Sequence, residues 1–114
     1  MYYDYKVMNK IFVYGTLKRG EKNSYLLDRI GGEWIEATVK GSLHEEGWGS
    51  KFGCPGIKVD VSGQVVHGYI FHSDKLEDNI SFFDEFEGIE YKRTITEITL
   101  NNGLTTKAYI YQLI

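Results

Sequence analysis

This sequence has one cysteine, one proline and no long apolar run. The scarcity of cysteine and the lack of a long apolar run each exclude a class of structure. Cys54 is the single cysteine, so the chain can form no internal disulfide and no zinc site built on several thiolates. Pro55 is the single proline, and no apolar run approaches the roughly 18 residues that a membrane-spanning helix needs. Residues 1–10 carry Tyr and Asp where a secretion signal has an apolar stretch, so we expect a cytoplasmic protein with no membrane partner.

An excess of positive charge is also lacking. The 114 residues carry 13 Lys and Arg against 16 Asp and Glu, and this net charge of −3 argues against nucleic-acid binding. The negative charge is concentrated between Asp74 and Glu90, where seven carboxylates and one lysine give a local charge of −6. Aromatic residues are abundant instead. Nine Tyr and six Phe supply large, rigid side chains that suit a core or the wall of a pocket.

Apolar runs that alternate with glycine-containing turns predict one α+β domain over residues 10–114, after a tail or short leading strand over residues 1–9. We expect strands over residues 11–14, 33–44, 57–61, 64–72, 91–100 and 104–113, a short helix after an N-cap at Asn23 or Ser24, and a longer helix over residues 73–88. Gly41 is expected to interrupt the second strand. Ser62–Gly63 and Asn101–Gly103 are typical hairpin turns. The mixed sheet of about six or seven strands is expected to curl into a small β-barrel, with the helices packed outside.

The longer helix has one carboxylate out of place. Its apolar stripe consists of Leu76, Ile80, Phe83 and Phe86. Glu87 projects into the middle of that stripe, whereas Asp78 and Glu85 lie on the opposite face, where a surface helix keeps its charges. A carboxylate in an apolar surface loses hydration, which raises its pKa and makes it a better base near neutral pH.

The ends of this helix carry matching signals. Ser73 and Asp74 can cap its first turn, and Asp74 with Glu77 approximates a capping box. Gly88 is a natural stop at the other end. Glu87 therefore falls in the last turn, where helices fray, and a solvent-exposed terminal carboxylate is the alternative to a functional one.

The turn after the first strand is a second candidate site. Gly15 and Gly20 have the spacing of a phosphate-binding loop, but Glu21–Lys22 stands where that loop needs Lys followed by Ser or Thr. Free backbone N–H groups at residues 15–17 could instead hold a carboxylate or an oxyanion. An ordinary strand-to-helix turn is the alternative.

Other chemistries find little support. His44, His67 and His72 are scattered and have no chelating spacing, so we expect no metal site. No nucleophile-elbow pattern accompanies any serine or threonine. By elimination, any chemistry rests on a carboxylate that faces a glycine turn, which indicates general-base catalysis with electrostatic help from the backbone.

The loop over residues 45–56 joins two predicted strands and is rich in glycine. It carries two large aromatic residues, Trp48 and Phe52, which is more typical of a lid over a binding site than of a linker. Cys54 has no basic neighbour in sequence to activate it, so we expect an ordinary free thiol there.

Two motifs together resemble the γ-glutamylcyclotransferase-like (AIG2-like) family. The matching segments, in chain order, are Tyr14–Gly20 with Asn23, Val66–Tyr69, and Phe83–Gly88 followed by Tyr91 and Arg93. The match spans residues 10–113 in family-like order and spacing. Lys-Arg-Gly after the turn and Asp-Glu-Phe-Glu around the carboxylate are most similar to the γ-glutamylamine branch, which releases an amine such as a lysine side chain.

The resemblance implies a mixed β-barrel with flanking helices and an enzyme that acts on a small γ-glutamyl molecule. In the implied reaction the α-amine of the γ-glutamyl group attacks its own γ-carbonyl, which gives 5-oxoproline and a free amine without a cofactor. Glu87 is implied as the general base that deprotonates the α-ammonium group. The residues implied to bind the glutamyl end through backbone groups are Tyr14, Gly15, Thr16 and Leu17.

Further site residues follow from the resemblance with alternatives left open. Tyr91 and either Tyr109 or Tyr111 are expected to line the site. Arg93 is expected to pair with a substrate carboxylate or with Glu87, or else to form a structural ion pair.

The resulting hypothesis is geometric: Glu87 should face the Gly15 turn across a pocket, while Asp84 and Glu85 are bystanders. A non-catalytic module that binds a small carboxylate metabolite on the same scaffold is one alternative, and a different carboxylate-based hydrolase is another. The oligomeric state and the physiological substrate are left open.

Overall fold

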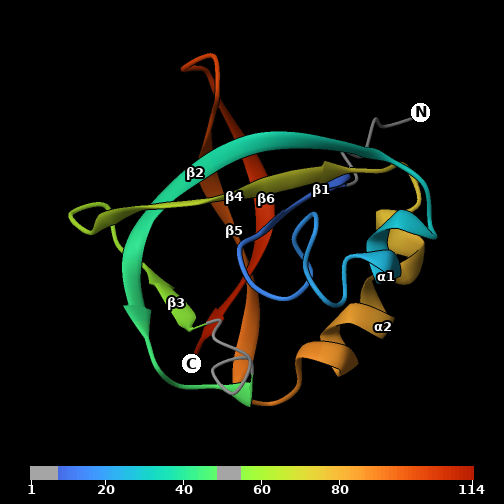
Figure 1. The fold of residues 1–114 in the computed structure, drawn as a ribbon, viewed down its shortest axis with the longest axis horizontal. Helices are drawn as coiled ribbons and strands as arrows, with labels where there is room; N and C mark the ends of the chain where they lie inside the picture. Colours follow the sequence, from blue (N-terminus) through green and yellow to red (C-terminus); the bar gives the residue numbers. More distant parts are fainter. Residues whose placement is uncertain (1–7, 49–54) are drawn as a thin grey trace, which may run out of the picture.

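The computed structural model describes residues 8–48 and 55–114, and within them the chain forms six strands and two helices (Figure 1). The elements are β1 Lys10–Val13, α1 Tyr25–Asp28, β2 Glu33–His44, β3 Gly56–Val59, β4 Gln64–His72, α2 Leu76–Glu87, β5 Tyr91–Leu100 and β6 Thr105–Leu113. The predicted α+β class is confirmed, whereas the strand considered for residues 1–9 lies mostly outside the described residues. None of the described helices is long and apolar enough to cross a membrane.

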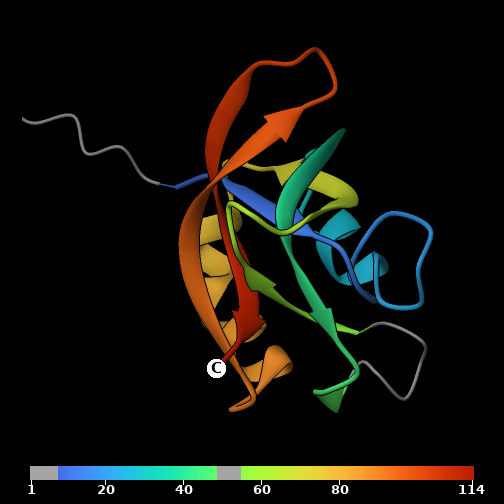
Figure 2. The same ribbon diagram turned by 90° about the vertical axis from the view of Figure 1, so that its left-hand side faces the viewer.

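Five strands close into a barrel, and β3 is added to it. Neighbouring strands pair in the order β2, β4, β1, β6, β5, and β5 pairs back onto β2 at Ala37 opposite Leu100 and Thr38 opposite Thr99. The pair of β1 and β6 is parallel and the others are antiparallel, so the sheet is mixed, as predicted. Both helices lie outside the barrel on one side of it (Figures 1 and 2).

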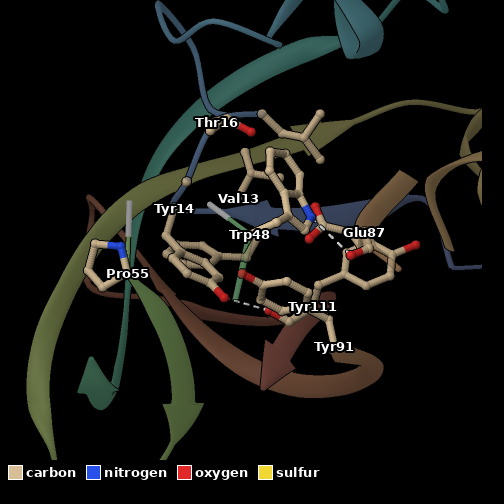
Figure 3. A pocket seen from close by; sticks show the side chains of 11 residues that line it. Val13, Tyr14, Thr16, Trp48, Pro55, Glu87, Tyr91 and Tyr111 are labelled. Carbon is tan, nitrogen blue, oxygen red and sulfur yellow. Dashed lines mark hydrogen bonds between the residues drawn. The ribbon is translucent and has the colours of Figure 1, made fainter. Parts of the chain in front are cut away.

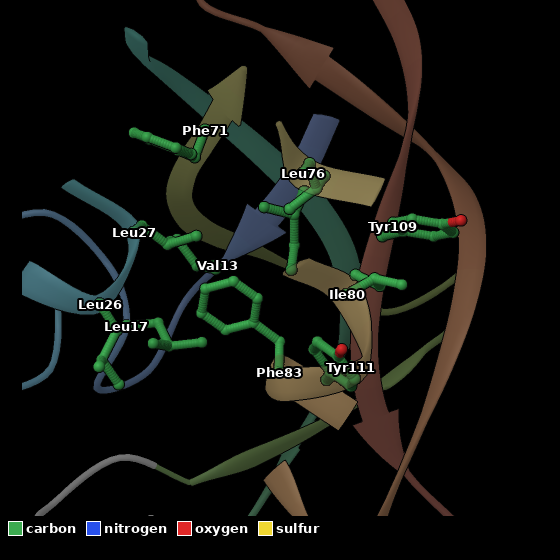
Figure 4. Close-up of a cluster of buried hydrophobic side chains, with 11 residues drawn as sticks. Val13, Leu17, Leu26, Leu27, Phe71, Leu76, Ile80, Phe83, Tyr109 and Tyr111 are labelled. Carbon is green, nitrogen blue, oxygen red and sulfur yellow. The ribbon is translucent and has the colours of Figure 1, made fainter. Parts of the chain in front are cut away.

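β1 separates two apolar clusters, and this position explains why its sequence is apolar throughout. Ile11 and Val13 pack with the helices, while Phe12 packs with strand residues inside the barrel, because successive side chains of a strand point to opposite faces. All three are at most 4% exposed. Figure 4 shows the helix-side cluster, whose members include Leu26 and Leu27 of α1 and Leu76, Ile80 and Phe83 of α2.

The predicted hairpin over Ser62–Gly63 is wrong. β3 and β4 both run antiparallel to β2, so the chain does not reverse direction between them. β2 pairs with β4 from Glu33 to Gly41 and with β3 from Gly41 to His44, and it continues through Gly41 without the predicted interruption. A Cβ atom at Gly41 would lie 2.6 Å from the carbonyl oxygen of Lys58, so the close approach of β3, rather than a break in β2, requires this glycine.

The other predicted hairpin is confirmed. β5 and β6 pair along their whole lengths across the turn at residues 101–103. Gly103 has a φ of 89°, which favours glycine, and the N–H of Leu100 donates to the carbonyl of Leu104 at 2.7 Å. This hairpin delivers the tyrosines of β5 and β6 to the side of α2.

α2 is shorter at its start than predicted. It begins at Leu76, and the Ser73 hydroxyl accepts a hydrogen bond from the backbone N–H of Lys75 at 3.1 Å. The prediction of a capping box is wrong, because no side chain caps the first turn of α2. Glu77 instead accepts a hydrogen bond from the Tyr109 hydroxyl at 2.7 Å. The predicted stop is confirmed, since α2 ends at Glu87 and Gly88 follows with a φ of 85°.

Candidate active site

A cavity lies between the end of α2 and the turn that follows β1 (Figure 3). We call it the Glu87 cavity. The described residues that line it are Phe12, Val13, Tyr14, Gly15, Thr16, Leu17, Trp48, Pro55, Glu87, Tyr91 and Tyr111. Residues from both sequence motifs thus meet at one cavity, although some 70 positions separate them in the chain.

Glu87 is the last residue of α2 and is half-buried at the cavity wall. Phe83, one turn earlier, is fully buried in the core and fixes this face of the helix. Within residues 8–48 and 55–114 the Glu87 carboxylate has no hydrogen-bond partner. Burial raises its pKa from 4.5 to about 7, because a low-dielectric site disfavours the charged form. Glu87 is therefore not the frayed, exposed carboxylate that the sequence left as an alternative.

The turn at residues 15–17 offers backbone donors to the same cavity. The N–H groups of Gly15, Thr16 and Leu17 have no hydrogen-bond partner in the described part of the chain, whereas the Gly15 carbonyl accepts from Lys18 N–H at 3.1 Å. Asn23 holds the turn in shape: its side-chain amide donates to the Thr16 hydroxyl at 3.1 Å and its N–H donates to the Thr16 carbonyl at 2.8 Å. Asn23 thus braces the turn and does not cap α1.

Tyr14 closes one side of the cavity. Its hydroxyl donates to the Tyr111 carbonyl at 2.7 Å and accepts from the Ile57 N–H at 3.2 Å. Burial raises the pKa of this hydroxyl further above its ordinary value, so it stays protonated. The hydroxyl joins β1 to β6 and β3, and the ring is left as a wall of the cavity.

Of the tyrosines considered on β6, the structure brings Tyr111 to the cavity and not Tyr109. Both point to the same face of the strand, but two residues move the side chain about 7 Å along it. The Tyr109 hydroxyl donates to Glu77, near the start of α2. Tyr91, at the start of β5, lines the cavity as predicted.

Arg93 does not line the Glu87 cavity. Of the alternatives considered for it, the structure shows the ion pair, which Arg93 forms with Asp84. Its Nε and one terminal nitrogen donate to the two carboxylate oxygens of Asp84 at 2.9 and 3.1 Å. Its guanidinium also lies over the ring of Tyr109 at 4.5 Å. The charge of Arg93 is therefore directed at α2, away from the cavity.

Asp84 is not the bystander that the sequence predicted. Besides Arg93, it accepts a hydrogen bond from the Tyr111 hydroxyl at 2.6 Å, and the ring of Tyr111 lines the cavity. Burial alone would raise the pKa of Asp84, but the bonds from Arg93 and Tyr111 outweigh it and hold the pKa below its usual range. Asp84 thus fixes one wall of the site. The periodicity of α2 could not reveal this, because it gives no partner on another element.

Trp48 lines the cavity from the segment after β2. Its indole N–H donates to the backbone carbonyl of Glu87 at 3.0 Å, and its ring meets the Phe86 ring edge to face at 5.2 Å. Phe52 and Cys54 lie outside the described residues. Pro55, which the sequence did not single out, also lines the cavity.

No group of three or more His, Cys, Asp or Glu side chains that could hold a metal ion occurs in the part of the chain that the structure describes. His44, for example, is engaged through Nε2 with the Ser42 hydroxyl at 2.8 Å. The described residues of the cavity offer a carboxylate and backbone donors without hydrogen-bond partners among them, together with aromatic side chains. That set suits acid–base chemistry on a small polar molecule.

Comparisons with known proteins identify the family and the fold. A family model described as gamma-glutamyl cyclotransferase, AIG2-like, matches residues 11–113. Gamma-glutamylaminecyclotransferase A of Danio rerio is 31% identical over 109 residues, which cover 89% of this chain and 66% of that protein. Among solved structures, YkqA from Bacillus subtilis matches with a TM-score of 0.71 and 27% identity over 94% of this chain and 36% of that chain. An AIG2-like protein from Mus musculus matches with a TM-score of 0.69 and 28% identity over 92% and 76%. The chain thus spans just under two thirds of the zebrafish relative and about a third of YkqA.

Proposed function

The chain belongs to the gamma-glutamyl cyclotransferase (AIG2-like) family, and we propose that it converts a γ-glutamyl amine to 5-oxoproline and the free amine, with Glu87 as general base. The observation that supports this most is the Glu87 carboxylate, whose pKa is raised to about 7, in one cavity with the N–H groups of residues 15–17; none of these groups has a hydrogen-bond partner among the described residues. A base works best when its pKa lies near the working pH. The proposed reaction needs no cofactor, because nucleophile and electrophile belong to the same molecule.

The proposed sequence of proton transfers is balanced. The Glu87 carboxylate accepts a proton from the substrate's α-ammonium group, and the freed lone pair attacks the γ-carbonyl carbon. A new C–N bond closes the five-membered ring, and the amide bond to the departing nitrogen then breaks. The ring nitrogen gives up two protons in all and the departing nitrogen gains two, so Glu87 ends the cycle ionised, as it began.

The turn at residues 15–17 supplies the electrostatic half of the proposal. The attack places a negative charge on the former carbonyl oxygen, and preformed N–H donors stabilise such a charge more than they stabilise the neutral ground state. The bonds of Asn23 to Thr16 hold these donors in place before substrate arrives. The same donors are suited to the substrate's α-carboxylate, so the turn binds the glutamyl part in either role.

Two observations favour a γ-glutamyl amine over a γ-glutamyl peptide. The zebrafish relative carries the name gamma-glutamylaminecyclotransferase A. In addition, no Lys or Arg is found among the described residues that line the cavity, and its largest side chains are aromatic. A γ-glutamyl peptide would place the carboxylate of the departing α-amino acid next to the scissile amide, where the described residues offer it no cationic partner. In an amine such as an ε-linked lysine, an aliphatic chain that can lie on aromatic rings separates the departing nitrogen from any charged group.

The test is release of 5-oxoproline by purified protein from ε-(γ-glutamyl)-lysine, a γ-glutamyl dipeptide and glutathione. We expect fastest release from the γ-glutamyl-lysine and a large loss with Glu87→Gln. Glu85→Gln is the matched control, because Glu85 is exposed two residues away on α2. Release from none of the three, or equal release by Glu87→Gln and the wild type, would contradict the proposal. Tight binding without release would indicate the non-catalytic module instead.

A further inference from the structure

We infer that Trp48 is a positioning residue for Glu87: its ring keeps water from the carboxylate, and its indole N–H fixes the end of α2. This inference rests on the base role proposed for Glu87 and names the residue that prepares it. Trp48 bonds the backbone carbonyl of Glu87 and not its carboxylate. Its effect on the proposed reaction is therefore exerted through the position of Glu87.

The first support is the way Trp48 holds the helix end. The last carbonyl groups of a helix have no partner within the helix. The Glu87 carbonyl is one of them, and the indole N–H of Trp48 satisfies it at 3.0 Å. The Trp48 ring also packs edge to face against Phe86, the preceding residue of α2. Together these contacts fix the last turn of a helix that would otherwise fray.

The second support is the segment that carries Trp48. Gly47 has a φ of 85°, and a Cβ atom at this position would collide with the hydroxyl and ring of Tyr91. Glycine is favoured at this backbone conformation and leaves room for the Tyr91 side chain, so the residue before Trp48 lies close against β5. Trp48 is therefore held from two sides, by β5 through Gly47 and by α2 through its own ring and N–H.

The third support is electrostatic. Among the described residues that line the cavity, the titratable groups that face Glu87 from other elements are the tyrosines Tyr14, Tyr91 and Tyr111, and a tyrosine side chain is ordinarily uncharged near neutral pH. On α2, the charge of Asp84 is offset by Arg93. The remaining carboxylates close to Glu87 or Trp48 in sequence, Glu45, Glu46, Glu85 and Glu90, are exposed. Loss of hydration is accordingly the cause of the raised pKa of Glu87, and the side chains that exclude water control it.

Trp48 is the aromatic wall that can be removed without disturbing the barrel. Phe12, Tyr91 and Tyr111 belong to strands. The Tyr14 hydroxyl links the strands β1, β6 and β3. Trp48 belongs to neither a strand nor α2. Its truncation should therefore admit water to Glu87 and leave the fold in place.

The experiment measures the pKa of the Glu87 carboxyl group by carbon-13 NMR in the free protein, for the wild type, Trp48→Ala, Trp48→Phe and Trp34→Phe. Trp34 is the chain's only other tryptophan, and its indole N–H also bonds an oxygen, that of Asp28 at 2.8 Å, away from the cavity. Trp34→Phe is thus the matched control. A near-ultraviolet circular dichroism spectrum of each variant reports whether it has folded.

We expect the Glu87 pKa to stay near 7 in the wild type and in Trp34→Phe, and to fall by about one unit or more in Trp48→Ala, because water then reaches the carboxylate. Trp48→Phe keeps a ring but loses the N–H donor. It should retain the raised pKa, and its kcat should fall by about tenfold while KM changes little, since a small misplacement of the base slows the reaction step.

Two results would overturn the inference: a folded Trp48→Ala protein whose Glu87 pKa stays near 7, or equal shifts in the Trp48 and Trp34 variants. The pKa measurement needs no substrate. If the Trp48→Ala shift is found but no 5-oxoproline is released by the wild type, the shielding role of Trp48 stands and the proposed function fails.

Discussion

Asp84 and Glu87 lie one turn apart on α2, and the two carboxylates have opposite surroundings. Asp84 accepts bonds from Arg93 on β5 and Tyr111 on β6, and its pKa is lowered. Glu87 has no hydrogen-bond partner for its carboxylate among the described residues, and its pKa is raised to about 7. The helix supplies the same chemical group twice, and the neighbouring elements decide what each copy does.

In the proposed mechanism, this difference gives Asp84 a structural role and Glu87 the role of the base. The Asp84 carboxylate accepts hydrogen bonds from Arg93 and Tyr111. These bonds fix α2 against the barrel and orient the Tyr111 ring at the cavity. Glu87 is left available because, in the part of the chain that the structure describes, no donor bonds its carboxylate, and the Trp48 indole N–H bonds its backbone carbonyl instead. A carboxylate that is already satisfied is a poor base, whereas one that is desolvated and unpaired is ready to take a proton.

The largest expected effect is on turnover. Glu87→Gln should lower kcat by about 10³-fold, because it removes the proton acceptor of the proposed reaction and keeps the size of the side chain. Asp84→Asn should lower kcat by only about tenfold, through a less well oriented site. Rates of 5-oxoproline release from ε-(γ-glutamyl)-lysine measure both. Equal losses in the two variants would mean that the carboxylates do not divide their roles in this way.

The next effect is the pH dependence of stability, where the two carboxylates should act with opposite sign. The folded-state pKa of Glu87 is raised, so the stability it contributes is fully present below about pH 4.5 and is lost as the pH rises through 7. The Glu87→Gln side chain cannot ionise, so the variant does not lose this stability. Its free energy of unfolding relative to that of the wild type should therefore be about 1–3 kcal/mol more favourable at pH 8 than at pH 5. Urea unfolding at the two pH values measures this. A constant difference would contradict the raised pKa.

Asp84 should show the reverse behaviour, with a smaller magnitude because it is partly exposed. Its pKa is lowered, so its contribution is present above the ordinary Asp pKa of about 4 and is lost as the pH falls through the lowered value. Asp84→Ala should cost about 1–2 kcal/mol of unfolding free energy at pH 7, with the loss of charge-assisted bonds reduced by solvent screening. The same urea experiment at pH 7 checks it, and a stabilised Asp84→Ala protein would refute the anchoring role.

The smallest effect sharpens the contrast between two tyrosines on β6. Tyr111→Phe and Tyr109→Phe each remove one hydroxyl that bonds a carboxylate on α2, so each should cost about 0.5–1.5 kcal/mol. Only Tyr111 lines the cavity. KM should therefore rise a few-fold in Tyr111→Phe and stay unchanged in Tyr109→Phe. A larger KM change in Tyr109→Phe would show that the wrong tyrosine had been assigned to the site.

The sequence was informative wherever a local pattern determines the structure. The Asn101–Gly103 turn, the apolar stripe of α2 and the stop at Gly88 were predicted because each depends on a few adjacent residues. Glu87 was found because it interrupts that stripe. The meeting of Glu87 with the Gly15 turn was predicted from paired motifs, and the structure brings both to one cavity.

What could not be predicted depends on contacts between distant elements. Asp84 looked like an ordinary surface charge, since its partners Arg93 and Tyr111 belong to other strands. The resemblance offered Tyr109 or Tyr111 as a site residue but could not say which of them reaches the end of α2. The residues Ser62–Gly63 are typical of a hairpin turn, but the sequence could not show that both flanking strands pair with β2 and run in the same direction.

The pH dependence of kcat/KM for the wild-type protein, with ε-(γ-glutamyl)-lysine as substrate, tests the central claim most directly. This ratio reports the pKa of the essential base in the free enzyme. Glu87 as the base predicts an acid limb with an apparent pKa near 7, present also in Asp84→Asn. An acid limb near 4.5, or a profile that is flat from pH 5 to pH 8, would contradict the claim that Glu87, half-buried and without a hydrogen-bond partner among the described residues, takes the proton.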